Sequence, residues 1–426
     1  MLARIFLETA ARMKFLTPLL FLTASLHAAT LPGFRVDTLT SVPGIVSSLV
    51  ADSHGALYCT TTSGTLYRIE GSAAVPVVSF PTHEGGNAGL LGMALLDDRT
   101  AAVHYTTWSG EKVLDDVISL VDLVTGAETV LHDFVCDIDV RERGASAEHH
   151  GGNPAIGPDG AIYVGIGEYN EFSLAQQPEW NGGKIFRIER NGHVTQFARG
   201  MRNPYDLAWD PELERIVVSD NGPAGGDELH IIDEGANCGW PLTVGHQPQV
   251  NGTVPPVYVF PVTVAPTGLL RLTPDANPIL GRGYLSGAFV TKALYYFPDI
   301  HFPDTATPVD DPLPIIEQFD EAVIDATQAP GGEIYFATLR FPSVSHIHHL
   351  AVPRRGDCDG DGFVDWRDLG ALSSELGDGD PHPALRAQDG AFAGSWGCDA
   401  NADRVIDSRD LAALMRQLVR PRSVRH

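Results

Sequence analysis

A stretch of twelve residues toward the C-terminus, 357–368, carries acidic side chains at the spacing of a calcium-binding loop. Acidic residues fall at positions 1, 3, 5, 9 and 12 of this stretch, namely Asp357, Asp359, Asp361, Asp365 and Asp368. Gly362 at position 6 permits a sharp turn, and Phe363 at position 7 offers a backbone carbonyl. Carboxylates and carbonyls are the hard ligands that calcium prefers, so the spacing predicts a calcium site rather than an acidic surface run.

The same pattern recurs further along the chain and predicts a second calcium site. Its ligand positions are Asp399, Asn401, Asp403, Asp407 and Asp410, with the carbonyl of Val405 at position 7. Arg404 stands at position 6, where glycine is preferred, so we expect the second site to be the weaker one. Apolar helical stretches follow the two loops, over 369–376 and 411–419. Because clustered carboxylates repel one another, we expect calcium to drive folding of this module.

Histidines provide candidate bases elsewhere in the chain. His149 lies in a Gly-rich phrase over 148–160, and its imidazole can accept a hydroxyl proton near neutral pH. A role lining a channel without chemistry is the alternative for His149. A second group comprises His346, His348 and His349. On a strand, His346 and His348 would share one face while His349 points away, and we interpret them as part of a closing strand without a metal.

A repeated phrase indicates the scaffold that must position these residues. A turn followed by an apolar, β-rich strand begins at Asp52, Pro158, Pro211 and Pro330, at separations of about 54 residues or about twice that. A period near 50 is typical of propeller blades, and residues 34–352 would hold roughly six of them. The sequence predicts an all-β, six-bladed β-propeller followed by a small α-helical, EF-hand-like module. A tandem of β-sandwiches is the alternative.

Several motifs, in order, resemble those of the soluble quinone-dependent glucose and sorbosone dehydrogenases. They lie at residues 149–160, 183–188, 200–204, 219–228 and 235–241, and the resemblance covers about three-quarters of the chain. It implies that His149 is the catalytic base and that Arg202 stabilises negative charge on the quinone. The cofactor, pyrroloquinoline quinone, would accept the hydride.

The resemblance also implies a set of cofactor ligands. Asn203 would hydrogen-bond the quinone, Lys292 would pair with one of its carboxylates, and Asn87 stands where the family carries a longer Gln or Glu. The carbonyls of Gly222 and Pro223 would help to hold a calcium ion that touches the quinone.

Other positions depart from the family pattern. Asn153 replaces an arginine, and Ala322 and Ile324 stand where two arginines grip the cofactor carboxylates, although Asp325 is kept. Two functions therefore stay open. One is an oxidoreductase acting on the anomeric carbon of an aldose or related sugar; the other is a non-catalytic propeller that binds carbohydrate or protein. A calcium-dependent hydrolase or lactonase is disfavoured, because the sequence offers no acidic ligand set for it.

The C-terminal module, expected over 353–426, resembles a type I dockerin, because each of its two loops ends in aspartate and precedes one helix. Its spacer, 377–397, is longer than usual, and residues 366–367 and 408–409 lack the small hydroxyl pairs of cohesin-binding dockerins. The resemblance implies a cohesin-like protein or a cell-surface component as partner. Cys358 and Cys398 adjoin the loops, where either a disulfide or two free thiols would fit.

The N-terminus and the charge favour an exported protein. Met13 and Lys14 open an apolar run that ends at Ala28 and Ala29, which predicts a signal peptide over 1–29, with Met13 as a possible start; an uncleaved anchor is the alternative. No later stretch is long enough to span a membrane. The formal charge of −25 argues against nucleic acid as a partner. We expect a propeller over 30–352 that is secreted, periplasmic or on the cell surface.

Overall fold

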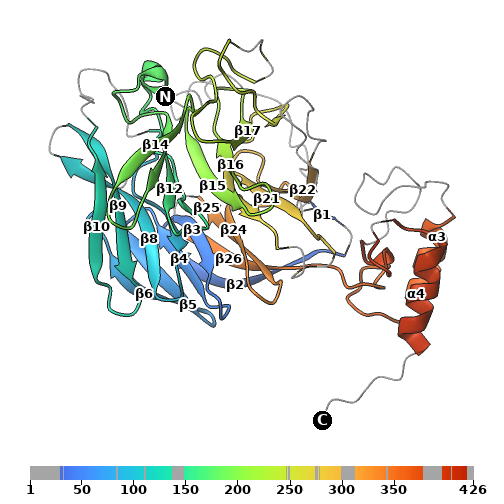
Figure 1. Ribbon diagram of the computed structural model, residues 1–426. Coiled ribbons are helices and arrows are strands. Elements are labelled where there is room, and N and C mark those ends of the chain that lie inside the picture. Colours follow the sequence, from blue (N-terminus) through green and yellow to red (C-terminus); the bar gives the residue numbers. More distant parts are fainter. Residues whose placement is uncertain are drawn as a thin grey trace, which may run out of the picture.

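Six sheets, antiparallel apart from one short parallel pairing at the edge of the third, are arranged around a central axis and form the body of the molecule (Figure 1). The computed structural model describes residues 29–377 and 396–419, except for 32, 83–84, 110–111, 137–147, 246, 248–249, 274–276, 278, 299–311, 342–343 and 404. The predicted six-bladed β-propeller is confirmed. Apart from Ala29, the predicted signal peptide lies outside the described residues.

Each blade begins with the strand nearest the axis, where it contacts the first strands of its neighbours. Blades 1 and 2 comprise β3 (Val46–Ala51), β4 (Leu57–Thr61), β5 (Thr65–Glu70), β6 (Ala73–Ser79), and β7 (Leu90–Leu95), β8 (Thr100–Ser109), β9 (Lys112–Asp122), β10 (Glu128–Phe134). Blades 3 and 4 comprise β11 (Ala155–Ile156), β12 (Ile162–Ile166), β13 (Lys184–Ile188), β14 (Val194–Arg199), β18 (Ala236–Asn237), and β15 (Pro204–Asp210), β16 (Arg215–Asp220), β17 (Glu228–Ile232), β19 (Tyr258–Val259). Blades 5 and 6 comprise β20 (Pro266–Arg271), β21 (Gly283–Ala288), β22 (Ala293–Pro298), β23 (Leu313–Glu317), β1 (Ala29–Thr30), and β24 (Ala322–Gln328), β25 (Ile334–Arg340), β26 (Val344–Ala351), β2 (Arg35–Pro43).

The blades pack face to face, so both faces of each sheet need apolar side chains. Central strands such as β4 and β12 are accordingly buried along their whole length. The ring is closed by the chain's own ends, because β2 pairs antiparallel with β26 from Arg35 opposite Ala351 to Pro43 opposite Val344. β1 extends the outer edge of blade 5 by pairing with β23. One N-terminal segment therefore joins the last two blades.

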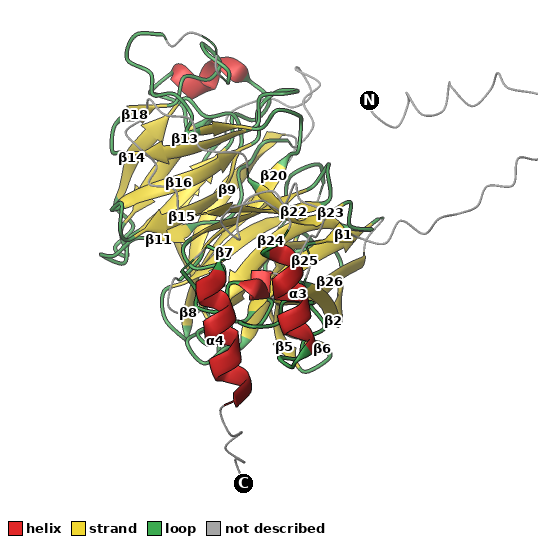
Figure 2. Cartoon of the chain, turned by 90° about the vertical axis from the view of Figure 1, so that its right-hand side faces the viewer, coloured by secondary structure: helices red, strands yellow, loops and turns green. Residues whose placement is uncertain are grey.

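The C-terminal module contains α3 (Arg367–Glu375) and α4 (Ser408–Val419), which lie side by side (Figure 2). A disulfide links Cys358 to Cys398, with a Cα–Cα distance of 4.3 Å. These cysteines form a small core with Leu372 and Leu414. The structure thus shows the disulfide, not the free thiols.

One aromatic side chain docks this module against the propeller. Trp396, in the short 3-10 helix η2 (Trp396–Cys398), is buried with its ring centroid 5.2 Å from Phe34 and 5.8 Å from Tyr296. The guanidinium of Arg35 donates to the carbonyl of Asp361 at 3.3 Å. Among the helices of the described ranges, none is both long and apolar enough to cross a bilayer.

Candidate active site and calcium loops

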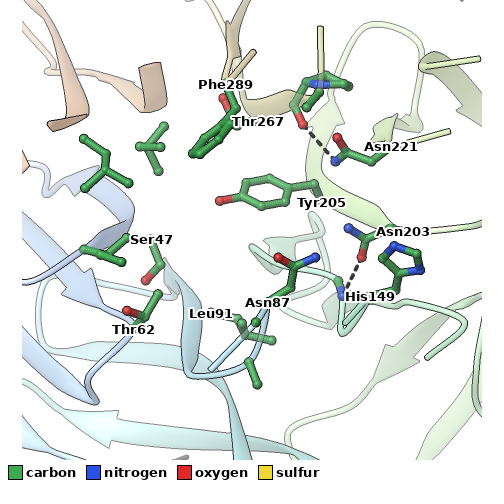
Figure 3. Close-up of a pocket in the computed structure, with 18 of the residues that line it drawn as sticks. Ser47, Thr62, Asn87, Leu91, His149, Asn203, Tyr205, Asn221, Thr267 and Phe289 are labelled. Carbon is green, nitrogen blue, oxygen red and sulfur yellow. Dashed lines mark hydrogen bonds between the residues drawn. The ribbon is translucent and has the colours of Figure 1, made fainter. Parts of the chain in front are cut away.

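A cavity of about 510 Å³ opens where the blades converge on the axis (Figure 3). Its floor is made by β-bulges, because five of the six innermost strands slip register near their first residues. At each slip one residue left out of the ladder lines the cavity, and these residues are Ser47, Leu91, Tyr205, Thr267 and Ile324. Bulges of this kind re-aim side chains next to functional sites. Of these five, the sequence comparison with the family singled out only Ile324, which stands where the family carries an arginine.

His149 lies at the rim with one ring nitrogen fixed. Its backbone is left-handed (φ 61°), and its Nδ1 lies 2.5 Å from Oε1 of Glu168. Both side chains are buried, the Glu168 side chain fully. Since Nδ1 is engaged, Nε2 is the nitrogen left for a ligand in the cavity. The Glu168 carboxylate also stabilises an imidazolium once His149 takes a proton.

Glu168 was missed in the sequence, because nothing in the spacing of 19 residues indicates that the two side chains meet. It follows β12, and its backbone amide donates to the carbonyl of Arg202 at 2.9 Å. Asn203 completes the arrangement by accepting a bond from the amide of Gly151 at 3.0 Å. The turn that carries His149 is therefore tied to the strands of blades 3 and 4.

Arg202 lines the cavity as expected, but its guanidinium is already bonded. Nη1 donates to the carbonyls of Asn221 at 2.7 Å and Gly222 at 3.0 Å, and the guanidinium carbon lies 5.9 Å from the ring centroid of Trp240. The Gly222 carbonyl, one of the two expected calcium ligands, thus accepts a hydrogen bond from Arg202. The carbonyl of Pro223 instead accepts the amide of Gly226 within a turn, and Pro223 is not among the lining residues.

Of the remaining predicted cofactor ligands, two line the cavity and one does not. Asn87 and Asn203 both line the cavity. Lys292 lies outside it, and its ammonium donates to the backbone carbonyl of Asp320 at 3.0 Å. Among the described lining residues, Arg202 is the one Lys or Arg side chain.

Apart from Thr263 and Thr267, the wall contributed by blades 5 and 6 is apolar. Ile324 lines the cavity, and Ala322 is buried beneath it in a cluster with Leu339, Ile45 and Phe289. The loss of the two family arginines therefore leaves hydrocarbon at this wall rather than another cation. An anionic ligand would be gripped from the His149 side of the cavity, not from this one.

Below the floor, two buried carboxylates approach the axis. Asp206 accepts the amide of Leu269 at 2.6 Å, and Asp325 accepts the amide of Leu49 at 2.6 Å. Burial raises the pKa of Asp325 to about 7, and burial followed by repulsion from Asp325 raises the pKa of Asp206 well above its usual value. The amide of Asn153 lies 3.5 Å from Asp325. Asp206 thus ties the first strand of blade 4 to that of blade 5, and Asp325 ties the first strand of blade 6 to that of blade 1.

The first calcium loop is arranged around a ligand position. Asp357, Asp359 and Asp361 bring carboxylate oxygens within 4.8 Å of one another. One oxygen of Asp357, Oδ2, accepts the amide of Gly362, whereas Oδ1 is buried without a hydrogen-bond partner. Asp368 closes the loop by accepting the amides of Cys358, at 2.8 Å, and Asp365, at 2.7 Å. The carbonyl-bearing Phe363 lies in the same loop, with its side chain exposed.

The second loop repeats this arrangement. Asp410 accepts the amides of Asn401 at 3.0 Å and Asp407 at 2.8 Å, as Asp368 does in the first loop. Asp399 and Asn401 both accept the amide of Asp403, whose own carboxylate accepts that of Val405 at 3.1 Å. Arg404 lies outside the described residues. The oxygen donors of both loops suit a calcium ion.

Comparisons with known proteins agree with the motifs. Residues 38–340 match the family described as Glucose / Sorbosone dehydrogenase, and residues 355–419 match the Dockerin type I domain. Aldose sugar dehydrogenase of Escherichia coli (strain K12) is 25% identical over 314 residues, which cover 65% of this chain and 84% of the relative. The PQQ-bound aldose sugar dehydrogenase of Streptomyces coelicolor has a TM-score of 0.61 at 22% identity, over 76% of this chain and 100% of its own. The apo soluble aldose sugar dehydrogenase of Escherichia coli has a TM-score of 0.63 at 19% identity, over 75% and 100%.

Proposed function

Because this chain belongs to the glucose/sorbosone dehydrogenase family, we propose that it oxidises an aldose or related sugar at the anomeric carbon, using pyrroloquinoline quinone. The observation that carries the proposal is the buried His149–Glu168 pair, which opens onto the axial cavity beside Arg202 and Asn203. The relatives named above are aldose sugar dehydrogenases. The proposal assigns the cavity to the cofactor and the sugar together.

In this mechanism, Nε2 of His149 takes the proton of the anomeric hydroxyl group while the hydride leaves the carbon. When bound, the quinone supplies the two-electron acceptor for that hydride. Glu168 keeps the imidazole oriented and stabilises the positive charge that His149 gains. Arg202 contributes the positive charge of the cavity near the cofactor, and the apolar wall excludes water.

The residues present fit the reactive side of the quinone better than its far edge. Asn87, Asn203 and Arg202 would hold the quinone. The Gly222 carbonyl, which accepts a hydrogen bond from Arg202, would also act as one ligand of a calcium ion. The wall around Ile324 and Leu339 provides no cation for the cofactor's carboxylates. We therefore expect weaker cofactor binding than in a site with bidentate arginines at that wall.

We further propose that the protein acts outside the cytoplasm, attached through its C-terminal module. The disulfide Cys358–Cys398 suits an oxidising compartment, and the apolar run before Ala29 suits export. The calcium-loaded dockerin module would bind a cohesin-like protein or a cell-surface component. Fusion of the C-terminal module to a carrier protein, followed by pull-down of the calcium-loaded fusion with a panel of cohesins, tests this assignment.

The first test of the enzymatic proposal is titration of the calcium-loaded protein with pyrroloquinoline quinone, followed by absorbance and calorimetry. We expect stoichiometric binding that His149→Ala leaves intact, together with aldose-dependent dye reduction that this variant loses. His193→Ala removes an imidazole from an exposed turn and should change neither property. If micromolar quinone does not bind, the proposal fails for this cofactor. The cavity would then be screened as a carbohydrate- or protein-binding site, for which its apolar wall is suited.

A further inference from the structure

A second cluster of ligand-type side chains lies on blade 6, away from the axial cavity. A smaller cavity of about 270 Å³ is lined there by Glu321, His346, His348, Thr38 and Arg340. Glu321 precedes the innermost strand β24, the histidines are on β26, and Thr38 is on the closing strand β2. None of these residues takes part in the proposed oxidation.

The alternation of β26 brings the two histidines to one face. Nδ1 of His346 lies 2.8 Å from Oε2 of Glu321, and Nε2 of His348 lies 3.8 Å from the same oxygen. The three ligand atoms lie within 4.8 Å of one another. Ligands of one tetrahedral zinc ion, each about 2.1 Å from the metal, are roughly 3.4 Å apart, so small side-chain rotations suffice. His349 stands on the other face of the strand, against Tyr335.

The surroundings of His348 fix the orientation of its ring. His348 is buried against Phe336 and Phe319. Hydroxyl groups flank the ring, with Thr38 3.2 Å from Nδ1 and Thr338 2.9 Å from Nε2. A hydroxyl group can donate or accept a hydrogen bond, so the Thr38 hydroxyl can accept one from Nδ1–H when Nε2 coordinates a metal.

Glu321 is held in the orientation that a metal would need. Its Oε1 faces the guanidinium of Arg340 at 3.6 Å, and its Oε2 faces the histidines and accepts a hydrogen bond from the Thr338 hydroxyl. Its side chain is nearly buried, while that of His346 is 16% exposed on the cavity side. Ordinary hydrogen bonds among these groups explain a closing strand without a metal, as the sequence suggested. They do not explain why two imidazoles and a carboxylate converge beside an open cavity.

We propose that Glu321, His346 and His348 bind a divalent transition-metal ion of the zinc class, with a remaining coordination position open to the cavity. Two imidazoles and one carboxylate suit such an ion, whereas calcium requires six to eight oxygen ligands. The site joins β24 to β26 near Thr38 of β2. A bound ion would therefore reinforce the closure of the ring.

The test uses the full chain, stripped of transition metals and saturated with calcium so that the C-terminal loops are filled. Cobalt(II) titration should produce the visible absorption of a low-symmetry site with nitrogen ligands, at one ion per chain, and zinc should displace it. His346→Ala should weaken affinity by about 100-fold or more, because even groups that only orient a ligand are worth 10–100-fold. His349→Ala removes an imidazole from the opposite face of the same strand and should bind as the parent protein does.

Two results would overturn the proposal. One is the absence of saturable cobalt or zinc binding by the calcium-saturated protein. The other is binding of equal strength and spectrum in His346→Ala, which would place the ion elsewhere. Because His346 is partly exposed, this variant should fold, and the unfolding midpoint checks that it does. In the folded parent, added zinc should raise the midpoint, and in folded His346→Ala it should not.

Discussion

The axial cavity and the C-terminal calcium loops are built in opposite ways. Residues of the cavity come from all six blades, and those near His149 are fixed by buried hydrogen bonds to Glu168 and Asn203. The ligands of each calcium loop come instead from twelve consecutive residues, above a small core that contains one disulfide. The first site keeps its shape through the protein's own contacts. The second concentrates carboxylates that repel one another until a cation arrives.

The protonation behaviour of the two regions shows the same difference. Burial raises the pKa of Asp357 to about 6, and the neighbouring carboxylates of Asp368, Asp359 and Asp361 add to this. In the propeller, burial alone would raise the pKa of Asp116, but His150 and His104 lower it to about 2. The buried charge of Asp116 is therefore compensated by neighbouring histidines, unlike that of the Asp206 and Asp325 pair below the cavity floor. In the calcium loop, the clustered negative charge is compensated only when a cation binds.

Calcium removal should produce the largest difference between the two regions. At pH 7, excess EGTA should unfold the C-terminal module while the propeller's unfolding midpoint changes little. A ligand whose concentration is about 1,000 times its dissociation constant stabilises the folded state by about 4 kcal/mol. A module this small has little stability of its own, so loss of this contribution should unfold it. Limited proteolysis of the full chain, with cut sites mapped by mass spectrometry, should show rapid cleavage after residue 353 without calcium. Equal resistance with and without calcium would contradict this view of the module.

Glu168→Gln tests whether the cavity depends on internal preorganisation. The amide removes the charge that stabilises protonated His149, so we expect kcat to fall by about 100-fold or more, within the usual range for acid–base catalysis. Quinone affinity should stay within a few-fold, since Glu168 does not line the cavity. Glu189→Gln, at an exposed carboxylate paired with Arg187, is the matched control for dye-linked assays. Unchanged kcat in Glu168→Gln would remove Glu168 from the mechanism.

Acid should act on the propeller through Asp116. This carboxylate contacts His104 at 3.0 Å, His150 at 3.1 Å and the Tyr169 hydroxyl at 2.8 Å. Because its pKa is lower in the folded state than its ordinary 3.8, its stabilisation is complete above about pH 4 and is lost as the pH falls toward 2. The shift corresponds to roughly 2 kcal/mol.

Asp116→Asn should therefore destabilise the propeller at neutral pH and flatten its acid unfolding profile over this window. Denaturant titrations at several pH values measure both effects. The metal-free tail should respond in the opposite sense, since the raised pKa of Asp357 means that protonation near pH 6 and below favours its folded form. If the stability of both regions changed in the same direction as the pH falls, the contrast drawn between the propeller and the tail would be wrong.

The sequence allowed the tail to be predicted far better than the cavity. All ligands of a calcium loop lie within one stretch, so spacing alone identifies Asp357 through Asp368. In the propeller, family motifs led to His149, Arg202 and Asn203, but not to Glu168, whose contact depends on a left-handed residue and a distant strand. The floor residues depend on register slips that no local pattern reports.

Other differences also arise from tertiary packing. Lys292 was expected to face the cofactor, yet its strand end directs it to Asp320 instead. Arg202 lines the cavity as expected, but the sequence did not indicate that its guanidinium donates to the carbonyls of Asn221 and Gly222. The docking of Trp396 on the propeller had no counterpart in the sequence, since residues 377–397 were expected only as a spacer.

The smallest expected effect concerns an arginine that occurs at position 11 of both loops. Arg367 contacts Asp365 at 2.7 Å and Asp361 at 3.2 Å, and Arg409 contacts Asp407 and Asp403 in the same way. A guanidinium thus lies on the ligands of positions 5 and 9, where it competes with an incoming cation. Because these pairs are exposed, we expect Arg367→Ala to strengthen calcium binding only about two- to threefold, with the gain shrinking at high salt. Arg416→Ala, in the last turn of α4, is the control in calorimetric titrations. Weaker binding in Arg367→Ala would mean that the arginine orders these carboxylates for calcium instead of competing with it, and that this loop, like the propeller cavity, is partly organised by its own contacts.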